Sequence, residues 1–149
     1  MIVAATLIAA CGDGDDDGTP AACLTGTRTF SDALQNAPGA VRLEGEVSIG
    51  DCLARNQSAG DLARLGTITV ELATELNANA RRRLGGPATV QLGYLIGAVE
   101  RGAGETQGIH AELLRRLEAA ALFSPAGKPP PPPFDQAYGR GYAAGKDDG

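Results

Sequence analysis

Apolar residues recur at intervals of three and four along three stretches of the chain. Such intervals place the apolar side chains on one face of an α-helix, whereas a half-buried strand would alternate every second residue. The first stripe comprises Leu62, Leu65, Thr69, Leu72 and Leu76, the second Leu92, Leu95, Ile96 and Val99, and the third Ile109, Leu113, Leu114, Leu117, Ala120 and Ala121. The pattern therefore predicts an all-α fold, a small bundle built on about three main helices.

Local signals indicate where these helices begin and end. Ser58 is a good N-cap for the first helix, and the arginines at 81–83 suit its C-terminal end, where cations complement the helix dipole. Pro87 is well placed in the first turn of the second helix. Gly93 and Gly97 lie four residues apart on that helix, and we expect them to permit a close contact between two helices inside the domain.

The C-terminal region combines a proline run with an aromatic stripe. Pro129 to Pro133 predict a stiff polyproline II connector. Beyond it, Phe134, Tyr138 and Tyr142 stand four residues apart, which places three rings on one face of a short helix. Because that helix is short and rich in glycine, we expect it to dock on the bundle through its rings. The alternative is a detached tail that presents the rings to a partner.

The region before the first long helix is less regular. Residues 11–28 are rich in Gly, Asp and Thr and short of large apolar side chains, so we expect a disordered, solvated tether. A segment at 31–36 predicts one or two helical turns. Residues 41–53 alternate weakly and predict a loop with room for a short strand pairing.

The first ten residues are uncharged and apolar but too short to span a membrane, because ten helical residues cover only about half of the hydrocarbon core. The sequence Ile8-Ala9-Ala10-Cys11 resembles the lipobox of bacterial lipoprotein precursors. The rest of the chain, which is rich in alanine and interrupted by glycines, is similar to uncharacterised lipoproteins from high-GC bacteria. The resemblance implies cleavage before Cys11, acylation of that cysteine, and a protein held by lipid on the extracytoplasmic side of the membrane, in the cell envelope or periplasm.

One feature departs from secretory signals, which begin with a basic stretch. No Lys or Arg precedes the apolar run, and the first basic residue is Arg28. We therefore expect the true start to lie upstream. The predicted organisation is a signal peptide at 1–10, an acidic and Gly-rich tether at 11–28, a helical domain at 29–124, a Pro-rich linker at 125–133, and a short C-terminal helix and tail at 134–149.

The cysteine count agrees with an exported protein. The chain contains Cys11, Cys23 and Cys52, and an odd number leaves one thiol to explain, which lipidation of Cys11 would do. Cys23 and Cys52 would then form a disulfide, and a loop closed over that separation is stabilised by about 3–4 kcal/mol. The alternative is a pair of buried free thiols.

Charge and composition exclude several classes of protein. The net charge is −5 and the pI is 4.8, which argues against nucleic-acid binding and against adhesion to anionic lipid, since both need clustered basic residues. The single histidine and the lack of a Cys-x-x-Cys sequence argue against a metal site. Asp13, Asp15 and Asp17 match the start of a calcium loop, but its twelfth position is Leu24 rather than glutamate. No sequence resembles a nucleophile elbow or phosphate loop, so we expect no cofactor and no catalysis.

The preferred hypothesis for function is a structural or protein-interaction lipoprotein of the cell envelope. In this hypothesis an envelope protein binds the groove beside the stripe of Phe134, Tyr138 and Tyr142. The sequence does not identify that partner.

Two alternatives stay open. One is a small-ligand or substrate-binding module whose cavity is lined by Leu92, Leu95, Leu113 and Leu117. The other is a hydrolytic enzyme using His110, which needs a carboxylate or hydroxyl within about 3 Å of the ring. For a lone histidine, a solvated or locally hydrogen-bonded side chain is the more common role.

Overall fold

The computed structural model describes residues 18–149 and is all-α over that range, which confirms the predicted fold class. The elements are α1 (Thr27–Leu34), α2 (Ala59–Arg82), α3 (Pro87–Gly104), α4 (Ala111–Ala121) and α5 (Pro132–Asp148), with 3-10 turns η1 (Ala21–Leu24), η2 (Gly50–Cys52) and η3 (Pro125–Gly127). Residues 41–53 are mostly loop, and Leu43 and Val47 form one isolated antiparallel bridge there.

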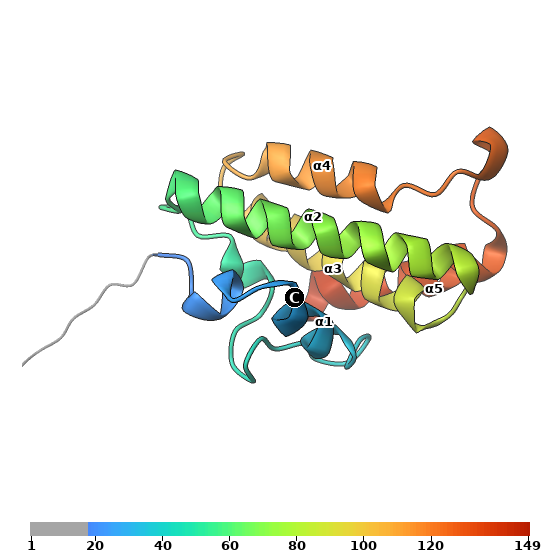
Figure 1. The fold of residues 1–149 in the computed structure, drawn as a ribbon, viewed down its shortest axis with the longest axis horizontal. Coiled ribbons are helices and arrows are strands. Elements are labelled where there is room, and N and C mark those ends of the chain that lie inside the picture. The colour runs from blue at the N-terminus through green and yellow to red at the C-terminus, as the bar shows by residue number, and fades with distance from the viewer. Residues whose placement is uncertain (1–17) are drawn as a thin grey trace, which may run out of the picture.

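Helix α3 forms the centre of the bundle (Figure 1). Helices α2 and α4 pack against it and against each other, and α5 covers a further face. The part of α3 from Pro87 to Val99 carries no charge, and the side chains of Leu92, Tyr94 and Leu95 are 0% exposed. A helix enclosed on all sides must be apolar on all sides, which explains this composition. The hydrophobic core therefore surrounds α3.

Helix α2 is the longest element, with 24 residues and a length of about 36 Å. Ser58 precedes it, and the Ser58 hydroxyl accepts a hydrogen bond from the Asp61 amide at 3.0 Å, as the capping preference of serine predicts. Leu65 and Leu72 on its inner face are each 1% exposed. Because α2 runs along most of the bundle (Figure 1), its two ends mark the two ends of the molecule.

Helices α3 and α5 run parallel and approach closely at glycines on both helices. A Cβ atom added at Gly93 would lie 2.8 Å from the backbone nitrogen of Tyr142, and one added at Gly97 would lie 3.0 Å from that of Lys146. On the other helix, a Cβ atom added at Gly145 would meet the backbone of α3 in the same way. The expected role of Gly93 and Gly97 in a close helix contact is confirmed.

Helix α5 docks on the bundle through the Phe134 ring, which is 4% exposed, as predicted, and also through small residues that the prediction did not include. Ala137 is 1% exposed and Gly141 is buried, whereas Tyr138 and Tyr142 are only half-buried. The helix contains 17 residues and begins at Pro132, inside the proline run, so it is longer than predicted. The glycines that weaken an isolated helix are the residues that let it approach α3, which also rules out a detached tail.

The N-terminal segment of the described chain is covalently attached to the bundle. Cys23 in η1 and Cys52 in η2 form the predicted disulfide, with Cα atoms 5.6 Å apart and both side chains 0% exposed. Residues 18–28 thus contain η1 and the start of α1, although their composition predicts a tether. The disulfide supplies the stabilisation that their few large apolar side chains cannot.

Candidate functional site

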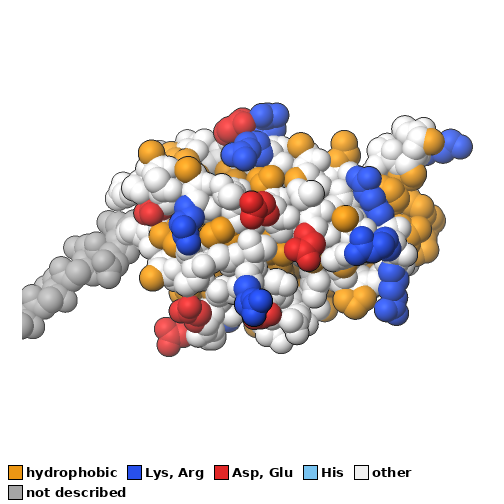
Figure 2. All heavy atoms as spheres, viewed as in Figure 1, with side chains coloured by type: hydrophobic (Ala, Val, Ile, Leu, Met, Phe, Trp, Pro, Cys, Tyr) orange, Lys and Arg blue, Asp and Glu red, His pale blue; other side chains and the backbone are white. Residues whose placement is uncertain are grey.

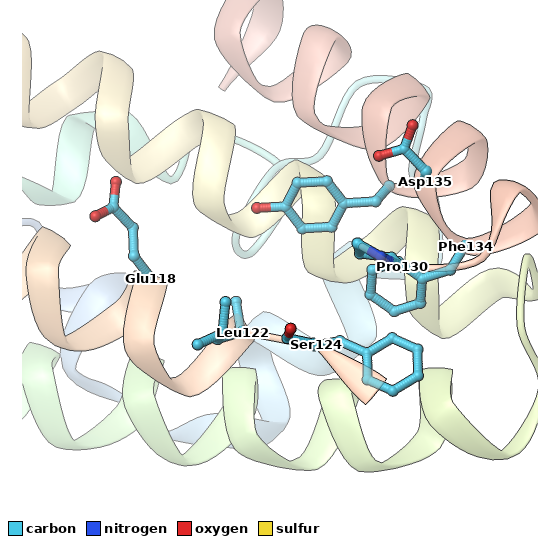
Figure 3. A pocket seen from close by; sticks show the side chains of 9 residues that line it. Glu118, Leu122, Ser124, Pro130, Phe134 and Asp135 are labelled. Carbon is cyan, nitrogen blue, oxygen red and sulfur yellow. The ribbon is translucent and has the colours of Figure 1, made fainter. Parts of the chain in front are cut away.

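A groove lies at the C-terminal end of α2, where the chain leaves α4, follows the Pro-rich linker and enters α5 (Figure 3). Its volume is about 340 Å³, at the lower end of the range for ligand sites. We call it the aromatic groove. Its lining consists of Glu118, Ala121, Leu122, Phe123, Ser124, Pro130, Phe134, Asp135 and Tyr138.

Four aromatic rings follow one another from the linker along α5. The ring centroids of Phe123 and Phe134 are 4.9 Å apart, those of Phe134 and Tyr138 are 6.0 Å apart, and those of Tyr138 and Tyr142 are 6.3 Å apart. Phe134 and Tyr138 line the aromatic groove, but Tyr142 lies beyond it. The sequence predicted the three residues on α5 and missed Phe123, because no periodic pattern marks a single ring after the end of a helix.

Side chains of α2 hold the start of the linker in place. The Asn77 amide donates hydrogen bonds to the carbonyls of Ala120, at 2.8 Å, and of Leu122, at 3.1 Å. Arg81 donates to the Leu122 carbonyl at 2.8 Å, and its guanidinium lies 5.1 Å from the centre of the Phe123 ring. The ring and cation therefore attract each other, and this side of the groove is fixed before any ligand binds.

The charged residues that line the aromatic groove are both acidic. Glu118 in α4 and Asp135 in the first turn of α5 lie on opposite sides of it (Figure 3). Among residues 18–149, neither carboxylate pairs with a cation. Burial raises the pKa of Tyr138 to about 12, so its hydroxyl stays protonated at neutral pH. The groove thus combines aromatic surface with negative charge.

Tyr142 ties α5 to α3 instead of lining the groove. Its hydroxyl donates a hydrogen bond to the Glu100 carboxylate, which also pairs with Lys146 at 3.2 Å. The hydrogen bond to Glu100 raises the pKa of Tyr142 to about 12, and the same bond lowers the pKa of Glu100. Tyr142 therefore positions the helix that carries Phe134 and Tyr138.

His110 is the centre of a buried polar network at the other end of the bundle. Its Nε2 atom lies 2.6 Å from Gln57 Oε1, and its Nδ1 atom lies 2.8 Å from the Thr106 hydroxyl. The Gln57 amide nitrogen donates to the Cys52 carbonyl at 3.0 Å and to the Thr19 hydroxyl at 2.7 Å. This arrangement directs the Gln57 oxygen toward the ring, so Nε2 carries the proton.

The geometry gives His110 a structural role. The Thr106 hydroxyl is within the distance that catalysis would need, but the ring is 0% exposed and both nitrogens are engaged, so a substrate cannot reach it. Burial lowers the pKa of His110, which favours the neutral ring. Of the two common roles for a lone histidine, solvated or locally hydrogen-bonded, His110 has the second, through Thr106. Gln57, far away in the sequence, was not predicted as a partner.

The four leucines expected to line a ligand cavity fill the core instead. Leu92, Leu95 and Leu117 are 0% exposed, and Leu113 is 5% exposed. Leu113 also borders a surface hollow of about 260 Å³ between α2 and α4. Helices α2, α3 and α4 contact one another, and these four leucines belong to the hydrophobic core that they share.

The residues expected to carry the lipid lie outside the described part of the chain. This applies to Cys11, to the predicted signal peptide at 1–10 and to the acidic run that includes Asp13. Across residues 18–149, no group of His, Cys, Asp and Glu side chains could hold a metal ion, and no helix has the length and hydrophobicity to cross a membrane. Comparison of the chain with protein families, curated proteins and solved structures finds no match.

Proposed function

We propose that the chain is a lipid-anchored, extracytoplasmic interaction protein of the bacterial cell envelope. Acylated Cys11 holds it at the membrane, and the aromatic groove receives a segment of an envelope protein. The proposal joins the lipobox-like sequence at residues 8–11 to a groove formed by the folded domain.

Cysteine usage supports the extracytoplasmic location. Cys23 and Cys52 form a buried disulfide, and structural disulfides persist mainly in oxidising compartments. Of the three cysteines, Cys11 is the one outside this disulfide, and it ends the lipobox-like sequence. Two or more acyl chains on one cysteine hold a protein durably at a bilayer, whereas a single chain holds it only marginally.

The position of the groove is the observation that carries the proposal. The described chain enters the bundle near the start of α2, where Thr19 bonds to Gln57. The aromatic groove lies near the opposite end of α2, a helix about 36 Å long (Figure 1). An anchor at Cys11 therefore attaches the end of the domain remote from the groove and leaves the groove accessible to a partner.

The surface near the groove also favours a partner. Leu122 lines the groove and is 66% exposed, so it adds apolar surface at the edge of the groove. In Figure 2, hydrophobic side chains gather at the same end of the molecule as the α4–α5 connection in Figure 1. An apolar centre with a polar rim is typical of protein-binding sites.

Metabolic labelling with an alkyne fatty acid tests the anchor. The wild-type chain and Cys11→Ser are expressed in the native host, fractionated and analysed by mass spectrometry. We expect label on Cys11 and membrane residence for the wild type, and loss of both for the variant. A mature wild-type protein with a free thiol at Cys11 and its leader attached would refute the proposal.

A comparison of two variants tests the groove as the interaction site. Leu122→Ser removes exposed apolar surface at the groove, and Ile109→Ser does the same at a position that is 50% exposed and distant from it. An envelope protein that co-purifies with the wild type should be lost with Leu122→Ser and retained with Ile109→Ser. Equal retention with both variants would exclude the groove.

A further inference from the structure

We propose that the end of the domain that carries Ile109 rests on the bilayer, with the Ile109 side chain inserted among zwitterionic lipids. This inference rests on the proposed lipid anchor and assigns a second membrane contact to the folded domain itself. We call this surface the anchor-side face. It consists of Ile109 and an apolar hollow between α2 and α4, which is lined by Ala59, Leu62, Ala63, Gly66, Ile109, Glu112, Leu113 and Arg116.

Ile109 is one of three exposed large apolar side chains in residues 18–149. It is 50% exposed, stands in the turn between α3 and α4, and borders the hollow, whose volume is about 260 Å³. The other two, Leu84 at 39% and Leu122 at 66%, follow the ends of α2 and α4 at the opposite end of the bundle (Figure 1). The anchor-side face is therefore separate from the aromatic groove.

Hydrogen bonds place this face beside the point where the chain from Cys11 reaches the bundle. Gln57 bonds to the Thr19 hydroxyl at 2.7 Å and to His110 Nε2 at 2.6 Å, and His110 directly follows Ile109. Cys11 precedes Thr19 by eight residues, which span at most about 28 Å even when fully extended. An acylated Cys11 therefore keeps Ile109 within reach of the bilayer surface.

The chain between the anchor and the fold does not supply an apolar cover for this face. Residues 12–17 are two glycines and four aspartates. A carboxylate loses its hydration in an apolar hollow, so these residues are poor occupants of it. Lipid is the apolar material that acylation of Cys11 brings to this end of the domain, and burial of Ile109 in it is favourable.

The charges at the rim of the hollow select the kind of lipid. The rim carries Glu112 and Arg116, one residue of each sign, and Glu112 also pairs with exposed Arg115 at 2.7 Å. With a net charge of −5, the chain has no general attraction for an anionic surface. A zwitterionic headgroup offers both signs to this rim. Because the contact is mainly apolar, we expect it to be insensitive to salt.

Tryptophan fluorescence tests the contact directly. The chain contains no tryptophan, so Ile109→Trp introduces a single indole at the anchor-side face. The full chain is coupled through the Cys11 thiol to a maleimide phospholipid in phosphatidylcholine vesicles, while Cys23 and Cys52 stay in their disulfide. We expect the indole emission to shift to shorter wavelength, and to lose intensity when the vesicle lipids carry bromine on their acyl chains.

Leu84→Trp is the matched control at the opposite end of α2, where the side chain is also partly exposed. Its emission should be unaffected by brominated lipid. Absence of quenching at position 109, or equal quenching at both positions, would overturn the proposal. An indole at position 109 that is shielded from aqueous acrylamide but not quenched by bromine would indicate contact between two copies of the chain, which also overturns it.

A second measurement keeps the native isoleucine, because tryptophan itself favours membrane interfaces. A maleimide lipid with one acyl chain holds a protein only marginally, so a further contact becomes visible as retention on the vesicles. Wild type should be retained about fivefold better than Ile109→Ser, since about half of the isoleucine side chain leaves water. Leu84→Ser should match the wild type. Retention that Ile109→Ser leaves unchanged would contradict the contact.

The vesicle measurements and the fatty acid labelling in the native host fail independently. A native chain without label on Cys11 refutes the proposed anchor. An indole at position 109 that stays unquenched on the coupled chain refutes the bilayer contact, even where the label is found.

Discussion

Replacing Gly145 with alanine tests the contact on which the bundle depends. Gly145 lies inside α5, where alanine would ordinarily stabilise a helix by about 1 kcal/mol relative to glycine. Here the new Cβ atom would lie 2.8 Å from the backbone nitrogen of Ala98 in α3. The obstacle is backbone rather than a flexible side chain, so only a movement of the whole helix relieves the contact.

That movement is resisted along the shared length of the two helices. The preceding turn of α5 is equally close to α3, because a Cβ atom at Gly141 would lie 2.9 Å from the backbone nitrogen of Tyr94. Overpacking in a core costs about 1–3 kcal/mol, and a backbone obstacle belongs at the upper end of that range. After subtraction of the helix-propensity gain, Gly145→Ala should lower the free energy of unfolding by about 2 kcal/mol. The melting temperature should fall by roughly 5–10 °C.

Gly139→Ala is the matched control on the same helix. Gly139 is exposed, and a Cβ atom there would meet nothing within 4 Å. This substitution should stabilise the domain by about 0.5–1 kcal/mol, since only helix propensity changes. Both variants are compared with the parent chain by thermal and urea unfolding, followed by circular dichroism. If Gly145→Ala were neutral or stabilising like the control, close packing of α3 on α5 would not explain the glycine.

Other parts of the fold should respond to substitution in defined ways. Replacing Cys23 and Cys52 together with alanine should lower the free energy of urea unfolding by about 3–4 kcal/mol, because the unfolded chain loses a constraint; a loss below about 1 kcal/mol would contradict this. Ser58→Ala should lower the free energy of unfolding by about 1 kcal/mol, because the helix cap is lost, and should leave the slope of that free energy against urea concentration unchanged. An unshifted midpoint of the urea transition would argue against the cap. Burial lowers the pKa of His110 in the folded state, so the unfolded chain takes up the proton first, and stability should decline as the pH falls through about 6.5. His110 is the only histidine, so His110→Gln should abolish this decline, and its persistence would assign it to another group.

The helices themselves were predictable because their signals are local. The stripes of α2, α3 and α4 lie within single helices, and Ser58 and Pro87 mark helix starts by their own chemistry. The pairing of Cys23 with Cys52 was also predictable, because the odd cysteine left only that pair after Cys11 had been assigned to lipid. Each of these inferences needed only residues close together in the sequence or the number of cysteines.

The features that were missed depend on contacts between distant segments. Gly141 and Gly145 weaken α5 as an isolated helix, and only the backbone of α3 beside them reveals their packing role. Gln57 and His110 are 53 positions apart, so no spacing rule connects them. The aromatic groove needs the end of α4, the linker and α5 together, and the sequence located only its α5 side, at Phe134 and Tyr138.

If the proposed function is correct, the placement of these contacts makes anchoring and recognition separable. The disulfide between Cys23 and Cys52 and the bonds from Gln57 to Thr19 and His110 attach the first described residues near the start of α2. The groove is held independently at the far end of α2, by the contacts of Arg81 with the linker and by the packing of α5 on α3. Because these two sets of contacts involve different residues, we predict that loss of the proposed lipid releases the protein from the membrane without altering the groove.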